Sequence, residues 1–179
     1  NSLIDSFIEP LTGMDYLRMH ETDELWPRDL PLTRSTLIDS LNTGHYGQVN
    51  QFGHGHFFNM SVGDANFTVS DAAALENPNP FLLFAINCAS GAFDMGCLLE
   101  RFVQNPDGGA IMSIGAAREA FPSNSFAYQD HTYNFMITHG EGRVAKALTD
   151  AKLIYVANTE RNTLDRWTQL NLVVIGDPA

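Results

Sequence analysis

The stretch FLLFAINCASGAF, residues 81–93, joins an unbroken apolar run to a turn of small residues. The run is apolar at consecutive positions from Phe81 to Ile86, not at alternating ones. Strands have this pattern when helices cover both faces of their sheet. The sequence therefore predicts a buried central strand, with Cys88 directly beyond its carboxyl end.

Working outward from this strand, apolar runs and helical patterns alternate along the chain. Three further runs predict strands over residues 49–52, 110–114 and 170–175. Helices are expected over residues 33–44, with Thr33 or Ser35 as the cap, over residues 94–104, and over residues 144–155, where Val144, Leu148, Ala151 and Tyr155 share one face. Such alternation favours right-handed crossovers, so we predict an α/β fold with a mainly parallel central sheet flanked by helices on both faces.

Length, charge and cysteine content exclude several classes of protein. The chain has 179 residues, of which 44% are hydrophobic, enough for one core. Its formal net charge of -11 would repel nucleic acid phosphates and an anionic membrane surface. No run approaches the ~18 apolar residues needed to cross a bilayer. Two cysteines are too few for a disulfide framework, and we expect both to be thiols.

Nucleophilic chemistry is predicted in the loops after two adjacent strands, because loops at the carboxyl ends of parallel strands form a common crevice. Cys88 follows the central strand, and His54 follows the strand over residues 49–52. A thiol needs a nearby base to act as a nucleophile at neutral pH. We predict Cys88 as nucleophile and His54 as general base, with the amides of Gly55 and Cys88 stabilising an oxyanion.

Each of these residues also has an ordinary structural explanation. Taken alone, Cys88 is typical of a small buried hydrophobe and His54 of a structural histidine. Their placement on neighbouring strand ends is what favours catalysis. His56 raises the alternative of a metal site, but zinc needs at least three protein ligands and the spacing marks no third. We predict no metal ligands.

In order along the chain, the segments GHG and NCASGAFD resemble the corresponding loops of the gingipain-like cysteine peptidases, relatives of the caspases. Four further segments resemble the surrounding elements of that family, namely LIDSLNTGHYGQVNQFGHG, CLLERFV, GGAIMSIGAAREAF and NLVVIGDPA. The likeness covers residues 32–179, which are expected to be the C-terminal part of a peptidase domain. Residues 1–31 form a poorly matched N-terminal segment, so either N-terminal strands are absent or the sheet is small.

The resemblance implies a caspase-like fold and a thiol peptidase that cleaves peptide bonds with a Cys88–His54 dyad. It implies that Phe121 lines the pocket for the substrate side chain. It also implies a secreted or cell-surface bacterial protein, made with further domains in a larger precursor and acting on protein or peptide substrates. No cofactor is required, although calcium at structural sites is implied; no calcium-binding loop is legible in the sequence.

The family's acidic residue that orients the histidine, and its specificity carboxylate, fall in the poorly matched segment and are not assigned to Asp15, Asp23 or Glu24. Two other functions stay open. The same dyad would serve a transpeptidase or sorting enzyme that passes the acyl group to an amine. A degenerate peptidase-like domain would serve as a non-catalytic module of a larger secreted protein.

Overall fold

A computed structural model describes residues 15–21, 29–63, 65–158 and 163–177. Its centre is a four-stranded sheet in the order β3-β7-β8-β9. β3, β7 and β8 are parallel, and β9 runs antiparallel to β8. The strands are β3 (Gln48–Phe52), β7 (Phe81–Ile86), β8 (Ala110–Ala116) and β9 (Leu172–Gly176). The predicted mainly parallel α/β fold is confirmed.

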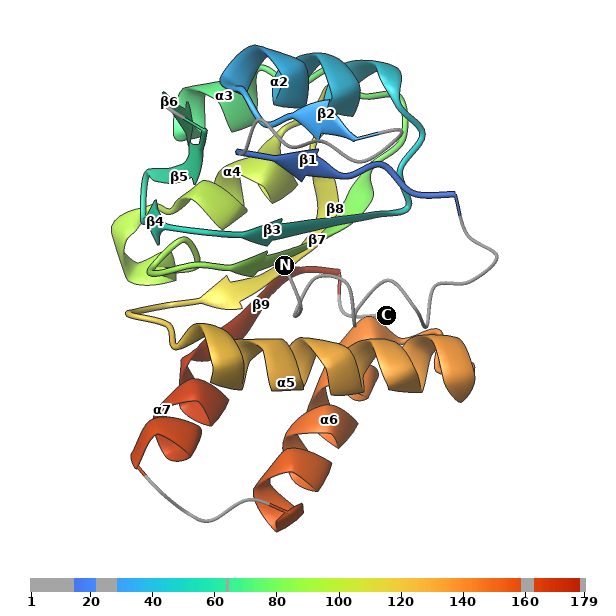
Figure 1. Ribbon diagram of the computed structural model, residues 1–179, viewed down its shortest axis with the longest axis vertical. Coiled ribbons are helices and arrows are strands. Elements are labelled where there is room, and N and C mark those ends of the chain that lie inside the picture. The colour runs from blue at the N-terminus through green and yellow to red at the C-terminus, as the bar shows by residue number, and fades with distance from the viewer. Residues whose placement is uncertain (1–14, 22–28, 64, 159–162, 178–179) are drawn as a thin grey trace.

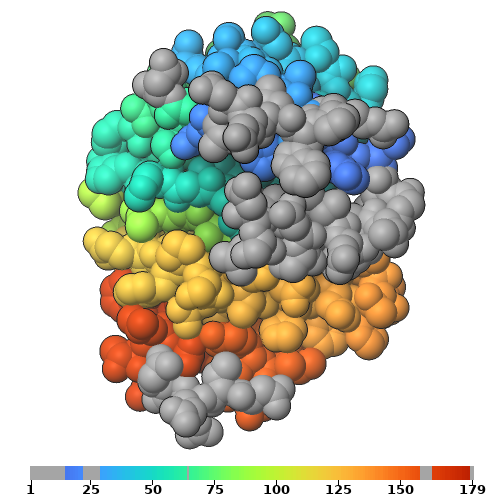
Figure 2. Space-filling view, in the orientation of Figure 1, coloured from blue at the N-terminus to red at the C-terminus, as the bar shows by residue number. Residues whose placement is uncertain are grey.

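Helices cover both faces of this sheet (Figure 1). On one face lie α2 (Arg34–Thr43), α3 (Val69–Ala73) and α4 (Leu98–Gln104). On the other lie α5 (Pro122–Tyr133), α6 (Val144–Asn158) and α7 (Thr163–Asn171). Figure 2 shows the same layers on the surface, with blue and green segments above the yellow ones and orange and red segments below.

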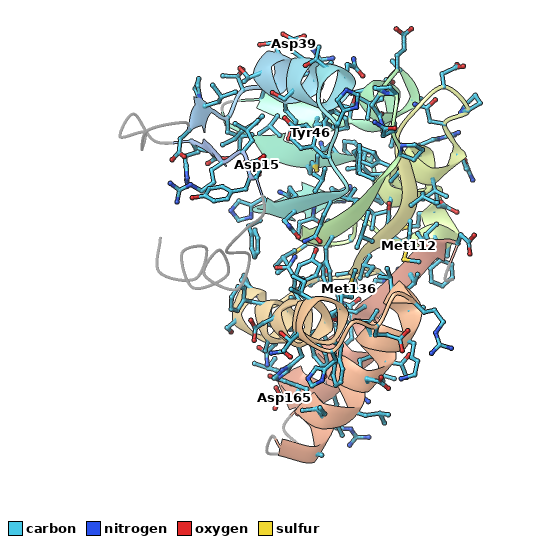
Figure 3. All side chains as sticks on the ribbon, turned by 90° about the vertical axis from the view of Figure 1, so that its right-hand side faces the viewer. Asp15, Asp39, Tyr46, Met112, Met136 and Asp165 are labelled. Atoms are coloured by element: carbon cyan, nitrogen blue, oxygen red, sulfur yellow. The ribbon has the colours of Figure 1, made fainter. Side chains whose placement is uncertain are left out.

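The apolar run of β7 is continuous because its two sets of side chains enter two different cores. Phe81, Leu83 and Ala85 pack with residues of α2, α3 and α4. Leu82, Phe84 and Ile86 pack with residues of α5 and α6 and with Met112 of β8. Figure 3 shows Met112 on the sheet and Met136, which packs against the same core, beside the helices. Every residue of β7 is buried, as expected for a strand covered on both faces.

Two of the three predicted helices, α2 and α6, begin where the sequence predicts. Thr33 caps α2, accepting a hydrogen bond of 3.1 Å from the Thr36 N–H, and the helix ends before Gly44. The helix expected from residue 94 begins instead at Leu98. Residues 93–95 form a 3-10 turn, and Gly96 adopts a left-handed conformation with φ of 68° that separates the turn from α4.

The last strand, β9, runs in the opposite direction to the other three strands of the sheet. Residues 163–171 form α7, which delivers the chain to the carboxyl end of β8, so Ala116 pairs with Leu172 and β9 runs back towards the start of β8. The Asp177 N–H consequently donates to the Ile111 oxygen at 3.3 Å. Gly176 and Asp177 therefore lie at the opposite end of the sheet from the loops that follow β3, β7 and β8.

Two small sheets flank the central one. β4 (Gly55–His56), β5 (Asn59–Val62) and β6 (Ala65–Thr68) form an antiparallel meander directly after β3. β1 (Met19–His20) and β2 (Leu30–Pro31) pair in parallel. Strands this short give no apolar periodicity, so the sequence does not predict them. None of the helices in the described ranges is long and apolar enough to span a membrane.

An ion pair joins the start of α2 to α3. Arg34 donates through Nε to Asp71 Oδ2 at 3.0 Å and also contacts Oδ1, while the Thr68 N–H donates to the same carboxylate at 2.8 Å. Burial of Asp71 acts to raise its pKa, but the bonds from Arg34 and Thr68 outweigh burial and leave the pKa below its usual value. The folded state therefore favours the ionised carboxylate.

We expect Asp71→Asn to lower the free energy of unfolding by about 2 kcal/mol, because Arg34 loses its carboxylate partner. In the protein with Asp71 intact, the Asp71 carboxylate of the unfolded chain binds a proton at a higher pH than that of the folded chain. Stability from this pair is thus complete above the ordinary pKa of 3.8 and is lost as the pH falls through the lower folded value. Urea unfolding at several pH values measures both effects. The exposed Asp39 of α2 gives the control, since Asp39→Asn should change stability little; equal losses would contradict the assignment.

Candidate active site

Cys88 lies in a turn that follows the most buried strand of the protein. Asn87 is 2% exposed, Cys88 is half-buried, and Ala89 has a left-handed φ of 55°. The Ala89 N–H donates to the Arg118 oxygen at 2.9 Å, which ties the turn to the loop after β8. The turn therefore holds the Cys88 sulfur at the carboxyl edge of the sheet. It does so with Ala89 in a backbone conformation that L-residues rarely adopt.

The strain at Ala89 predicts an unusual response to glycine. A left-handed conformation costs an L-residue about 1–2 kcal/mol, a cost that glycine does not carry. We expect Ala89→Gly to preserve the free energy of unfolding or to raise it by up to about 1 kcal/mol, and Ala89→Val to lower it by more than about 1 kcal/mol. Urea denaturation of the two variants measures this difference. A loss of stability in Ala89→Gly would contradict it.

The Cys88 sulfur contacts the loop that leads into α5. The Ala120 N–H donates to Sγ, with nitrogen and sulfur 3.4 Å apart, and Sγ lies 4.0 Å from the Ala120 oxygen. The next residue, Phe121, is half-buried and occupies the N-cap position of α5. The structure thus brings the predicted nucleophile and the loop of the predicted pocket residue together.

His54 lies at the same edge of the sheet, one strand away. Phe52 pairs with Ile86, so His54 and Cys88 each come two residues after a paired strand end. The Gly53 N–H donates to the Ile86 oxygen at 3.2 Å, which extends the ladder beyond the strands. The backbone of His54 is held on its other side by Ser61, whose N–H donates to the His54 oxygen at 2.9 Å. The imidazole is exposed.

Gly55 packs directly on the turn that carries Cys88. A Cβ at position 55 would lie 2.6 Å from Asn87 Cγ, which leaves no room for a side chain. Asn87 is itself fixed to β3, because its Nδ2 donates to Gln51 Oε1 at 2.7 Å. The absent side chain of Gly55 therefore sets the close approach of the two loops.

The backbone N–H groups of Gly55 and Cys88 take no part in the hydrogen bonding of the nearby described strands. Residues in antiparallel strands alternate between pairs that exchange hydrogen bonds and pairs that do not. Ser61 and His54 form a hydrogen-bonded pair, so the next pair, Gly55 with Met60, exchanges no hydrogen bonds. The Gly55 N–H therefore points away from β5. Among the described residues, the Cys88 N–H has no acceptor.

Other features expected of a complete site are not found in the described part of the chain. Within it, the His54 imidazole has no hydrogen bond to Cys88 or to another residue. Asp15 is exposed, and Asp23 and Glu24 lie outside the described residues. The His56 ring packs 4.4 Å from the ring of Phe57. No group of three or more His, Cys, Asp or Glu side chains in the described ranges could hold a metal ion, and the calcium implied by resemblance stays a prediction.

The second thiol has a different environment. Cys97 is fully buried at the N-terminus of α4, where its N–H donates to Glu100 Oε2 at 2.7 Å. Burial raises the pKa of the Cys97 thiol, and the adjacent Glu100 carboxylate adds to the effect. Neither exposure nor charge favours a thiolate at this position. Cys97 is a core residue.

Comparison with known proteins identifies the family to which a chain with this fold, and with Cys88 and His54 at one edge of its sheet, belongs. The sequence over residues 9–179 matches peptidase family C25, and the chain belongs to that family. Members of the family are cysteine peptidases and therefore hydrolases. The predicted resemblance to gingipain-like peptidases is confirmed.

Solved structures have the same fold. The complex of the pro- and mature domains of RgpB from Porphyromonas gingivalis superposes with a TM-score of 0.71 at 18% identity over 84% of this chain. The Arg-specific cysteine proteinase gingipain R (RgpB) gives 0.68 at 21% identity over 84%. A protein described only as a protease gives 0.69 at 16% identity over 98%.

This chain spans only part of each of these proteins, namely 37%, 36% and 51% of their respective lengths. No curated protein matches the sequence. At these identities the structural likeness establishes the fold, and the roles of individual residues rest on the geometry of this chain.

Proposed function

We propose that the chain is a cysteine peptidase that cleaves peptide bonds through a thioester, with Cys88 as nucleophile and His54 as general base. The observation that carries this proposal is the register of β3 and β7, which starts the His54 and Cys88 loops at the same level of the sheet. The hydrogen bond from Gly53 and the packing of Gly55 on Asn87 support it, because they keep the two loops side by side.

In the proposed reaction the His54 imidazole accepts the Cys88 proton as the sulfur attacks the carbonyl carbon of the scissile peptide. The resulting oxyanion accepts hydrogen bonds from the amides of Gly55 and Cys88. When the C–N bond breaks, His54 returns the proton to the leaving amine and a thioester remains. Water, deprotonated by His54, then hydrolyses the thioester and releases the acid and the free thiol.

The Ala120 N–H and Phe121 extend the proposed site on its other side. An N–H directed at sulfur stabilises negative charge there, and Ala120 is so placed at 3.4 Å. Phe121 follows it, half-buried, and would supply apolar contact to a substrate side chain. The substrates are proteins or peptides, and the chain acts as part of a larger exported precursor, a proposal that the pro- and mature domains of the similar protein RgpB support.

Trapping the acyl-enzyme tests the proposal. The chain is mixed with a peptide library, quenched in acid after short times and digested for mass spectrometry. We expect the acyl half of a substrate on Cys88 and none on Cys97. The same reaction with an added amine separates hydrolysis from transpeptidation, since a sorting enzyme would give a ligated product in place of the free acid. Turnover without an adduct on Cys88 would contradict the thioester route.

The exposed imidazole of His54 is the one observation that favours a non-catalytic module, because an orienting partner for it is not found among the described residues. A peptidyl acyloxymethyl ketone distinguishes this alternative. A peptidase should react with the reagent at Cys88 far faster than a free cysteine does. An inert domain should react no faster than the free amino acid.

A further inference from the structure

The loop of residues 117–121, here called the Cys88-contact loop, joins β8 to α5 and holds Ala120 against the sulfur. It has no regular secondary structure over most of its length. Its conformation must therefore be fixed by groups outside it. Those groups lie mainly at the junction of α7 and β9.

Asn171, the last residue of α7, forms three hydrogen bonds to this loop. Its side-chain Oδ1 accepts the Arg118 N–H at 2.7 Å, and its Nδ2 donates to the Glu119 oxygen at 2.8 Å. Its main-chain oxygen accepts the Ala117 N–H at 2.9 Å. At 7% exposure the side chain is shielded from water, which would otherwise compete for these bonds.

Three other residues hold the same loop. Ala89, in the turn that carries Cys88, donates its backbone N–H to the Arg118 oxygen at 2.9 Å. Trp167, one turn earlier on α7, donates its indole N–H to the Glu119 oxygen at 2.7 Å. The Arg118 guanidinium forms a two-point ion pair with Asp94, at 3.0 and 2.7 Å, in the turn that follows Cys88. The ion pair is exposed and contributes little by comparison. The buried side chain of Asn171 therefore supplies two hydrogen bonds to the loop, one to Arg118 and one to Glu119, from a position shielded from water.

We infer that Asn171 is a positioning residue that holds the Cys88-contact loop so that Ala120 meets the nucleophile and Phe121 meets the substrate. The inference rests on the proposed peptidase function and adds to it a residue from the far end of the chain. Asparagine suits the position because one amide side chain both accepts from Arg118 and donates to Glu119. Aspartate can accept but cannot donate, and it would place a carboxylate against the Glu119 oxygen.

The opposite end of β8 supplies a matched control. Asn77, 3% exposed, accepts the Gly109 N–H at 2.6 Å and donates to the Gly109 oxygen at 3.0 Å. It thus bridges backbone groups as Asn171 does, but at the amino end of the strand. Asn77→Asp repeats the chemical change and its cost in stability away from the candidate site.

The test compares wild type, Asn171→Asp and Asn77→Asp in their reaction at Cys88 with two reagents. A peptidyl acyloxymethyl ketone needs the loop, whereas iodoacetamide needs only an accessible thiolate, so the ratio of the two rates corrects for any change in the thiolate population. For Asn171→Asp we expect the ratio of the two rates to fall about tenfold or more, with the iodoacetamide rate within about twofold of wild type. For Asn77→Asp we expect the wild-type ratio. Hydrogen exchange at residues 117–121 should accelerate only in Asn171→Asp.

Trp167→Phe covers the case in which Asn171→Asp does not fold. It removes one bond to Glu119 from a residue 40% exposed and should lower the ratio in the same direction by a few-fold. Equal ratios and equal loop exchange in all variants would overturn the inference while leaving the peptidase proposal standing. A wild-type protein that shows no preference for the peptidyl reagent would instead overturn the peptidase proposal, and the inference with it.

Discussion

Cys88→Ala is expected to abolish peptide hydrolysis, with kcat/KM falling by about five orders of magnitude, while the fold is retained. The size of the effect follows from the role, because no other group can form the thioester. The fold should survive because Cys88 is only half-buried, and its described hydrogen bonds to the Cys88-contact loop are the two weak ones of its sulfur with Ala120. Hydrolysis of a fluorogenic peptide and circular dichroism measure the two properties.

The matched control for this prediction is Cys97→Ser, which changes the only other cysteine of the sequence. Cys97 is the N-cap of α4, a position that serine occupies well. This variant should keep nearly full activity. Comparable losses in both variants, or activity that persists in Cys88→Ala, would show that the nucleophile is another residue.

Gly55→Ala is expected to lower kcat by about 10²–10³-fold. The new Cβ would lie 2.6 Å from Asn87 Cγ, closer than such atoms approach, and Asn87 cannot withdraw because it is buried and bonded to Gln51. The His54 loop must therefore move away from Cys88. That movement displaces the proposed general base and the Gly55 amide together, so the loss should appear in kcat. Steady-state kinetics with a fluorogenic peptide measure it.

Gly47→Ala is the control for this second prediction. Gly47 directly precedes β3, the strand that leads into the His54 loop, and a Cβ there would meet nothing within 4 Å. Activity should be unchanged. If Gly55→Ala were as active as Gly47→Ala, the close contact between the two loops would have no part in catalysis.

The architecture was predictable wherever it rests on long apolar patterns. Phe81 to Ile86 indicated a strand covered on both faces, and the two cores of the protein account for that pattern. The direction of β9 was not predictable, because its apolar run is equally compatible with either orientation. It depends on α7, whose final residue Asn171 was expected to lie in the strand.

For the candidate site, the sequence predicted that His54 and Cys88 lie at one edge of the sheet, but it did not predict the residues that hold their loops in place. His54 and Cys88 follow strands, so topology alone places both at one edge. Ala120, Asn87 and Asn171 act through backbone contacts and packing between segments distant in sequence, as in the bond between Arg118 and Asn171, 53 positions apart. A single alanine or asparagine carries no signal of such a contact.

A crystal structure of the chain after reaction with a peptidyl acyloxymethyl ketone tests the central claim most directly. We predict a covalent bond from Cys88 Sγ to the inhibitor, the His54 imidazole within hydrogen-bonding distance of the reacting centre, and the inhibitor's carbonyl oxygen about 2.7–3.1 Å from the amides of Gly55 and Cys88. An unmodified sulfur, or an imidazole on the opposite side of the sheet edge from the inhibitor, would contradict the account.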